Sequence, residues 1–299
     1  MWTLKPSWLS LVKASTLMLA LLSVSGISQA QSESGAQRII ALAPHAVELV
    51  YMLGAGDRIV GTTEYADYPE AAKNIPRIGG YSGIQIERVL ELKPDLIIAW
   101  KGGNKDQDIE QMQALGLPVY LSITKKLDDI PKEMLSLGNK LGLVEKAQKA
   151  ALAFNQTLAK LRSDSQHKSK VSVFYQLWSE PLRAMAAGSW INELITGCGG
   201  VNVFDDASLD YPQVSIETVL LAKPQVILIP SQHGNKIEAG DKWAPWPEIP
   251  AVKNKQIHFI NGDIVHRFSG RILQGMQAVC DVLDEARAIH TVKNRSQHD

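Results

Sequence analysis

The sequence contains an internal repeat whose two copies lie 130 positions apart. Residues 86–100 read IERVLELKPDLIIAW, and residues 216–230 read IETVLLAKPQVILIP. Each copy begins with a short stretch of helical periodicity that Lys-Pro ends, and each continues as an apolar run short enough to be a buried strand. A helix-and-strand unit that occurs twice in one chain predicts two similar α/β lobes.

The similarity of the two halves extends beyond this repeat. In the first half, an apolar strand, a helix, a glycine-containing stop and a second strand are expected at residues 38–43, 44–53, 54–56 and 59–62. In the second half, the strand, helix and glycine stop are expected at residues 171–175, 190–195 and 197–200. A further helix at 106–115 and a strand at 118–123 continue the alternation, which predicts mainly parallel, doubly wound sheets. Ligands of such sheets bind outside the carboxyl ends of the strands, so we expect a ligand cleft between the lobes.

A long helix is expected between the two lobes. Residues 144–165 contain neither Gly nor Pro and are rich in Ala, Lys and Leu. A flexible hinge would instead contain Gly, Ser or Pro, so we expect only modest relative motion of the lobes. The predicted organisation is a leader at 1–30, a first lobe at 31–143, a linker helix at 144–166, a second lobe at 167–292 and a tail at 293–299. The second lobe is expected to end in a helix at 269–288, with a frayed polar segment from His290.

The first thirty residues have the pattern of a cleaved export signal. Lys5 and Lys13 precede or flank the apolar stretch 14–24, and the small residues Ser28-Gln29-Ala30 follow it. The apolar stretch is too short for a membrane anchor, and no cysteine follows it that would be lipidated. We therefore expect a soluble protein outside the cytoplasm.

Composition and motifs argue against several classes of function. The chain carries 31 basic and 31 acidic residues, which gives no basic surface for nucleic acid. It has no Gly-x-Ser-x-Gly elbow, phosphate-binding loop, His-Glu-x-x-His motif or dinucleotide fingerprint, so we expect no enzyme activity and no cofactor. The two cysteines, Cys198 and Cys280, are expected to pair in an exported chain, because they lack the spacing of a redox or metal site.

The histidine and acidic residues of the sequence do not favour a metal-ion receptor. The candidate ligands are His45, Glu64, Asp67, His233, Asp263 and His266. None of these has the close spacing typical of a metal site, and His45 is expected to act as a polar capping residue at a helix start.

Aromatic residues at predicted loops give a stronger signal. They are Tyr65, Tyr81, Trp100, Trp178 and Tyr211. Aromatic surface is costly to leave in water, so five such loops indicate a ligand that is large, flat or partly apolar, although each residue alone fits ordinary loop packing.

Tyr81 and Tyr211 precede Glu87 and Glu217 by the same six residues, which predicts one exposed carboxylate per lobe. A helix dipole favours a glutamate in a first turn, which explains either glutamate alone.

Together these features resemble the helix-linked periplasmic solute-binding proteins, and most closely their cobalamin-binding branch. The resemblance runs from about residue 38 to the C-terminal helix. Its most specific stretches are 64–69 (EYADYP), 86–104, 197–202 (GCGGVN), 211–215 (YPQVS) and 271–273.

The resemblance assigns roles to residues at matching positions. Tyr65 and Trp100 match ligand-contacting aromatics, and Tyr81 and Tyr211 stand where the family more often has tryptophan. Cys198 and Cys280 match the family disulfide. Glu87 and Glu217 match two glutamates that family members present to arginines of an ABC permease dimer.

Residues 263–267 match a ligand-contacting stretch with one departure from the family. Asp263 and Arg267 are retained, but Ile264, Val265 and His266 replace the aromatic middle. His266 is therefore considered either a polar rim residue or a group that approaches a cobalt or iron centre.

The resemblance implies a monomeric periplasmic protein that captures cobalamin or a related corrinoid and delivers it to an ABC importer. The alternatives are a haem or siderophore receptor of the same fold and a metal-cofactor-binding enzyme scaffold.

Overall fold

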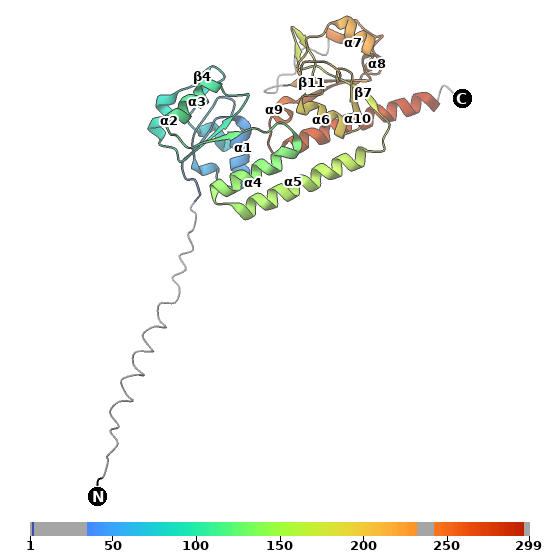
Figure 1. The fold of residues 1–299 in the computed structure, drawn as a ribbon. Helices are drawn as coiled ribbons and strands as arrows, with labels where there is room; N and C mark the ends of the chain where they lie inside the picture. The colour runs from blue at the N-terminus through green and yellow to red at the C-terminus, as the bar shows by residue number, and fades with distance from the viewer. Residues whose placement is uncertain (1, 3–34, 232–241, 296–299) are drawn as a thin grey trace. The chain divides into compact units, whose positions relative to one another are not determined.

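The computed structural model describes residues 2, 35–231 and 242–295, with 290–295 as backbone only. The predicted export signal and His233 lie outside this part of the chain. Residues from Gly35 onward contain two parallel four-stranded sheets (Figure 1). The first sheet has the order β2-β1-β5-β6, and the second has the order β10-β7-β11-β12. Matching the strands by their order along the chain gives the same arrangement twice, as the repeat predicts.

The first lobe is wound on both faces of its sheet. Its strands are β1 (Ile39–Ala41), β2 (Ile59–Thr62), β5 (Leu96–Trp100) and β6 (Val119–Ser122), and its helices are α1 (Pro44–Leu53), α2 (Ile86–Leu92), α3 (Asp106–Ala114) and α4 (Ile130–Leu141). A short hairpin joins β3 (Gly79–Gly80) to β4 (Gly83–Ile84). Ile39 and Ala41 pack into a cluster with α1, whereas Ile40 packs into a separate cluster with α2 and α3. This alternation follows from the two-residue period of a strand.

The second lobe repeats this plan, with helices that are as long as or shorter than those of the first. Its strands are β7 (Val171–Tyr175), β10 (Gly200–Asn202), β11 (Val226–Ser231) and β12 (Ile257–Asn261). Its helices are α6 (Trp190–Gly197), α7 (Ile216–Ala222), α8 (Pro250–Lys253) and α9 (Gly262–Val265), and a hairpin joins β8 (Trp178–Ser179) to β9 (Leu182–Arg183).

The two repeat copies have the same backbone conformation at their Lys-Pro stops. Lys93 ends α2 with φ 44°, and Lys223 ends α7 with φ 48°, so both lysines adopt the left-handed conformation that terminates a helix. The next position after each proline anchors the neighbouring central strand. Asp95 accepts hydrogen bonds from the backbone of Arg38 before β1, and Gln225 accepts one from the backbone of Ser172 in β7. The repeat therefore fixes the helix end and the strand start in both lobes.

Two long helices lie beside the lobes (Figure 1). The linker α5 (Val144–Ser165) packs against α4 and against α10 (Ile272–Arg295). The start and end of α5 agree with the helix expected between the lobes. Helix α10 runs to Arg295, so the expectation that the chain frays from His290 is wrong over those residues. The sequence has no Gly or Pro after Gly275 that would end the helix.

Cys198 and Cys280 form a disulfide, which confirms the predicted pairing. Both cysteines are buried, and the bond joins the end of α6 to the middle of α10. Across the described ranges, no helix combines the length and apolar character that a membrane crossing requires.

Candidate functional site

A cavity of 660 Å³ lies between the two lobes. From the first lobe it is lined by Pro44, His45, Tyr65, Tyr81 and Trp100, and from the second lobe by Trp178, Gly262, Asp263, His266 and Arg267. Several of these residues stand at or just after strand ends: Pro44 and Tyr65 lie three residues beyond β1 and β2, Gly262 directly follows β12, and Trp100 is the last residue of β5. The cavity thus lies at the carboxyl ends of both parallel sheets, where such folds bind their ligands.

Four of the five predicted loop aromatics line this cavity. Tyr81 is 92% exposed, Tyr65 62% and Trp178 59%, so large ring surfaces face the open space. Such exposure of several aromatic rings around one hollow is unusual for a surface without a partner.

Tyr211 does not line the cavity in this structure. It is 41% exposed, and its backbone carbonyl accepts a hydrogen bond of 3.0 Å from Nη1 of Arg183. Burial and the nearby Asp210 raise the pKa of its hydroxyl.

The stretch 263–267 contributes three of its five residues to the cavity. Asp263 lies in α9, while His266 caps the C-terminal end of this helix and Arg267 follows it, and all three line the space. Ile264 and Val265 do not line it. Val265 is 1% exposed, and its carbonyl accepts a hydrogen bond of 2.9 Å from Nε1 of Trp190. In this structure, Val265 therefore serves the core of the second lobe.

His266 is bound to a buried tyrosine. Its Nε2 lies 2.7 Å from the hydroxyl of Tyr175, which is itself fully buried. Burial lowers the pKa of His266 to about 4, so the ring is neutral at neutral pH. The hydroxyl thus occupies Nε2, one of the two ring nitrogens through which a histidine can bind a metal.

His45 forms part of the cavity wall rather than a helix cap. Ala43 is the N-cap residue of α1, and no side chain caps that end, so the expected capping role is wrong. The His45 ring meets Trp100 edge to face at 5.1 Å between ring centroids. Burial, with a contribution from the charge of Arg267, lowers the pKa of His45 to about 4. Its Nε2 has no hydrogen-bond partner among the described residues.

A buried ion cluster at the edge of the cavity was not predicted. Nη1 of Arg267 lies 2.9 Å from Glu48 Oε1 and 2.7 Å from Asp67 Oδ1. Nε of Arg271 donates to Glu48 Oε2 at 3.0 Å. Glu48 and Asp67 belong to the first lobe and the two arginines to the second, so the cluster joins the lobes. The one sequence signal was a glutamate on the otherwise apolar face of α1.

The two glutamates with the same register occupy matching positions. Glu87 and Glu217 are the second residues of α2 and α7, and both are exposed. The Ser215 side chain lowers the pKa of Glu217. Both carboxylates are accessible to a partner.

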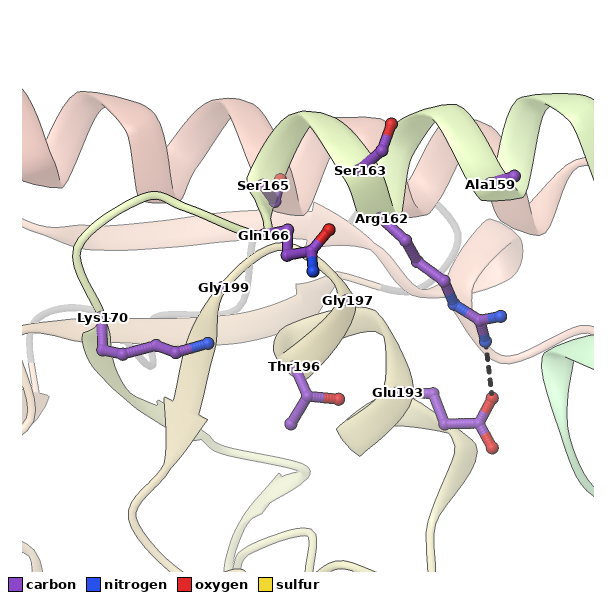
Figure 2. Close-up of a pocket in the computed structure, with 10 residues that line it drawn as sticks. All are labelled: Ala159, Arg162, Ser163, Ser165, Gln166, Lys170, Glu193, Thr196, Gly197 and Gly199. Atoms are coloured by element: carbon purple, nitrogen blue, oxygen red, sulfur yellow. Dashed lines mark ion pairs between the residues drawn. The ribbon is translucent and has the colours of Figure 1, made fainter.

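Other hollows lie outside the cleft or extend it. A smaller hollow of 170 Å³ adjoins it on the first lobe and shares Tyr65, Tyr81 and Trp100. A separate hollow of 510 Å³ lies where the end of α5 meets α6 (Figure 2). There Arg162 faces Glu193 at 3.7 Å and is also paired with Asp128, so its charge is already compensated. Within the described residues, no group of three or more His, Cys, Asp or Glu side chains is arranged to hold a metal ion.

Comparison with known proteins identifies the class. A family model described as "Periplasmic binding protein" matches residues 39–263. The chain belongs to this family of periplasmic binding proteins.

Individual relatives indicate which members of this family the chain resembles. The chain is 42% identical over 253 residues to a vitamin B12-binding protein of Vibrio cholerae serotype O1, covering 84% of this chain and 91% of the relative. It is 35% identical over 245 residues to a vitamin B12-binding protein of Yersinia pestis, covering 82% of this chain and 85% of the relative.

Solved structures agree with the fold. The crystal structure of the periplasmic vitamin B12-binding protein BtuF of Vibrio cholerae matches with a TM-score of 0.78 and 40% identity, covering 85% of this chain and 98% of that chain. The periplasmic heme-binding protein RhuT from Roseiflexus sp. RS-1 matches with a TM-score of 0.76 and 22% identity, covering 85% and 100%. The second likeness concerns the fold alone.

Proposed function

We propose that this protein captures cobalamin, or a related corrinoid, in the periplasm and delivers it to an ABC importer of the inner membrane. The vitamin B12-binding relatives, which match over more than four-fifths of their own length, support this ligand. In this proposal the protein acts as a monomer and catalyses no reaction.

The observation that carries the proposal is the ring of aromatic side chains from both lobes. Tyr65, Tyr81 and Trp100 of the first lobe and Trp178 of the second line one hollow of 660 Å³. A bulky, largely planar guest covers these rings and removes their apolar surface from water. Burial of a few hundred square ångströms contributes several kcal/mol at about 25 cal/mol per Å², before the cost of ordering the guest.

Polar groups on one edge give the guest an orientation. Asp263 and Arg267 line the cavity from the second lobe, where they suit amide groups at the periphery of a corrinoid. The site therefore combines an apolar interior with a few directed polar contacts. Tyr211, Ile264 and Val265 remain candidates for contacts that require a different arrangement of the lobes.

Delivery is proposed to use Glu87 and Glu217. Each glutamate is exposed near the start of a helix, and the two helices occupy corresponding positions in the two lobes. A permease dimer with two-fold symmetry would offer one arginine site per subunit, so each lobe could dock on one subunit through its glutamate. Charge pairs that lose their water at such an interface cost about 2–5 kcal/mol when one partner is truncated.

A calorimetric titration with cyanocobalamin, haemin and a ferric siderophore tests the ligand. We expect tight binding of cyanocobalamin alone. The unpaired nitrogen of His45 beside the cavity is the one feature that favours a haem receptor instead. Tight binding of haemin with a shifted Soret band, and none of cyanocobalamin, would overturn the proposal in favour of that alternative.

A further inference from the structure

Glu48 is a buried carboxylate that does not line the main cavity but is bonded to residues that do. It lies in α1 and is 3% exposed. Its oxygens accept hydrogen bonds from Arg267, Arg271 and the hydroxyl of Ser269, all on one segment of the second lobe. An ionised carboxylate withdrawn from water requires such compensation, so Glu48 fixes both arginines in place.

Each of these arginines contacts the same loop of the first lobe. Nη2 of Arg267 donates to the backbone carbonyl of Tyr65 at 3.2 Å, and its Nη1 is paired with Asp67. The guanidinium of Arg271 lies over the ring of Tyr68, 3.6 Å from the ring centroid. The loop 65–68 is therefore held from the opposite lobe at both of its ends.

Tyr65 needs this support more than an ordinary loop residue does. Its φ is 63°, in the left-handed region that non-glycine residues seldom occupy. A tyrosine persists in that conformation only where its surroundings hold it. The same conformation accompanies a side chain that is 62% exposed and lines the cavity.

We propose that Glu48 is a positioning residue for the ligand site, acting through Arg267 and Arg271 on the loop that presents Tyr65. Glu48 itself does not touch the guest. By anchoring Arg267 and Arg271 of the second lobe, Glu48 keeps Tyr65 of the first lobe in its position at the cavity. Tyr65 is therefore held in place only when the two lobes are in contact. This inference builds on the proposed corrinoid site but concerns the protein without ligand as well.

Hydrogen exchange on the ligand-free protein tests the inference without depending on the guest. The change is Glu48→Gln, which keeps the shape and removes the charge. We expect amide exchange in residues 65–69 to accelerate by about tenfold or more, while the hairpin at residues 79–84 exchanges as before. Unchanged exchange in 65–69 in the folded variant would overturn the proposal.

A matched control separates this effect from general loss of stability. Glu133 in α4 is also a buried glutamate, 7% exposed, and it accepts a hydrogen bond from Tyr120 at 2.7 Å. Glu133→Gln is expected to leave exchange in 65–69 unchanged. Equal acceleration in both variants would identify a purely structural role and contradict the inference.

A double-mutant cycle tests the link to ligand affinity. Tyr65→Ala is expected to weaken cyanocobalamin binding by about tenfold in the wild-type background and by much less in the Glu48→Gln background, because Tyr65 is already released there. Tyr81→Ala, on the hairpin that neither arginine contacts, is expected to have the same effect in both backgrounds. Additive effects of Glu48→Gln and Tyr65→Ala would contradict the proposal.

If Glu48→Gln does not fold, Arg271→Lys provides the second variant. It keeps the positive charge but removes the planar group that covers Tyr68. We expect faster amide exchange in residues 65–69. We also expect Tyr65→Ala to weaken cyanocobalamin binding less in the Arg271→Lys background than in wild type, although the difference is smaller than with Glu48→Gln. Absence of both effects would overturn the proposal. Failure of the wild-type protein to bind cyanocobalamin would count against the proposed function alone, because the ligand-free exchange still decides the role of Glu48.

Discussion

The hydroxyl of Tyr175 lies 2.7 Å from Nε2 of His266, and this pair commits one of the two ring nitrogens of His266 to the protein itself. Tyr175 is the last residue of β7 and is fully buried, so it contacts the imidazole from the protein interior. His266 lines the cavity while its Nε2 is bonded to this hydroxyl rather than to a guest. This arrangement supports the reading of His266 as a polar wall residue over the reading of it as a metal ligand.

Tyr175→Phe is expected to destabilise the protein by about 1–3 kcal/mol, because it leaves the buried Nε2 of His266 without its partner. Urea unfolding of the two proteins measures this difference. Cyanocobalamin affinity is expected to change little, since Tyr175 does not line the cavity. A large loss of affinity with unchanged stability would show that the pair acts on the ligand directly.

Stability is expected to fall as the pH drops from 6.5 towards 4. Burial lowers the pKa of His45 and of His266 from 6.5 to about 4, so in this window the unfolded chain binds protons that the folded protein does not. The contribution is complete above pH 6.5 and amounts to at most about 3 kcal/mol for each histidine. Urea unfolding at pH 7.5 and pH 4.5 should show a smaller loss for His45→Gln than for wild type. Equal losses in the two proteins would contradict the assigned pKa of His45.

The variant with both Glu87→Ala and Glu217→Ala is expected to bind cyanocobalamin as wild type does, yet to lose transport. Neither residue lines the cavity, and both are exposed. Calorimetry of the purified variant and uptake of labelled cobalamin by cells carrying it measure the two properties. Glu91→Ala on the same helix α2 serves as the control and should transport normally. Impaired ligand binding in the double variant would count against a docking role.

Replacing both cysteines by alanine is expected to cost about 2–5 kcal/mol of unfolding free energy. The disulfide closes a loop of 82 residues and joins α6 to α10 inside the second lobe. Urea unfolding compares the variant with the oxidised wild-type protein. Cyanocobalamin affinity at 10 °C, where the variant is still folded, should match that of wild type. A variant as stable as wild type would show that packing alone holds these helices together.

Much of the fold could be predicted because its signals are local. The Lys-Pro stops, the alternation of short strands and helices, and the absence of Gly and Pro in residues 144–165 each specify backbone conformation directly. The polar composition of the residues from His290 onward predicts fraying, yet α10 continues through them. Its continuation to Arg295 needs only residues compatible with a helix.

The site could be predicted only in part, because it is built from contacts between distant segments. The loop aromatics Tyr65, Tyr81, Trp100 and Trp178 were identifiable since each stands near a strand end. The pairing of Glu48 with Arg267 spans 219 residues and no local pattern reveals it. Likewise, the one-turn helix α9 directs Asp263 and His266 to the cavity and Val265 to the core, a choice that depends on where the turn begins.

The most direct test of the central claim uses one aromatic residue from each lobe. Cyanocobalamin is titrated by calorimetry into the variant that carries both Tyr81→Ala and Trp178→Ala, with Trp246→Ala as the control outside the cavity. Because each ring contributes its buried face to a guest held between the lobes, we predict affinity reduced by about a hundredfold or more in the double variant and unchanged in the control. Wild-type affinity in the double variant would show that the guest does not lie between the lobes.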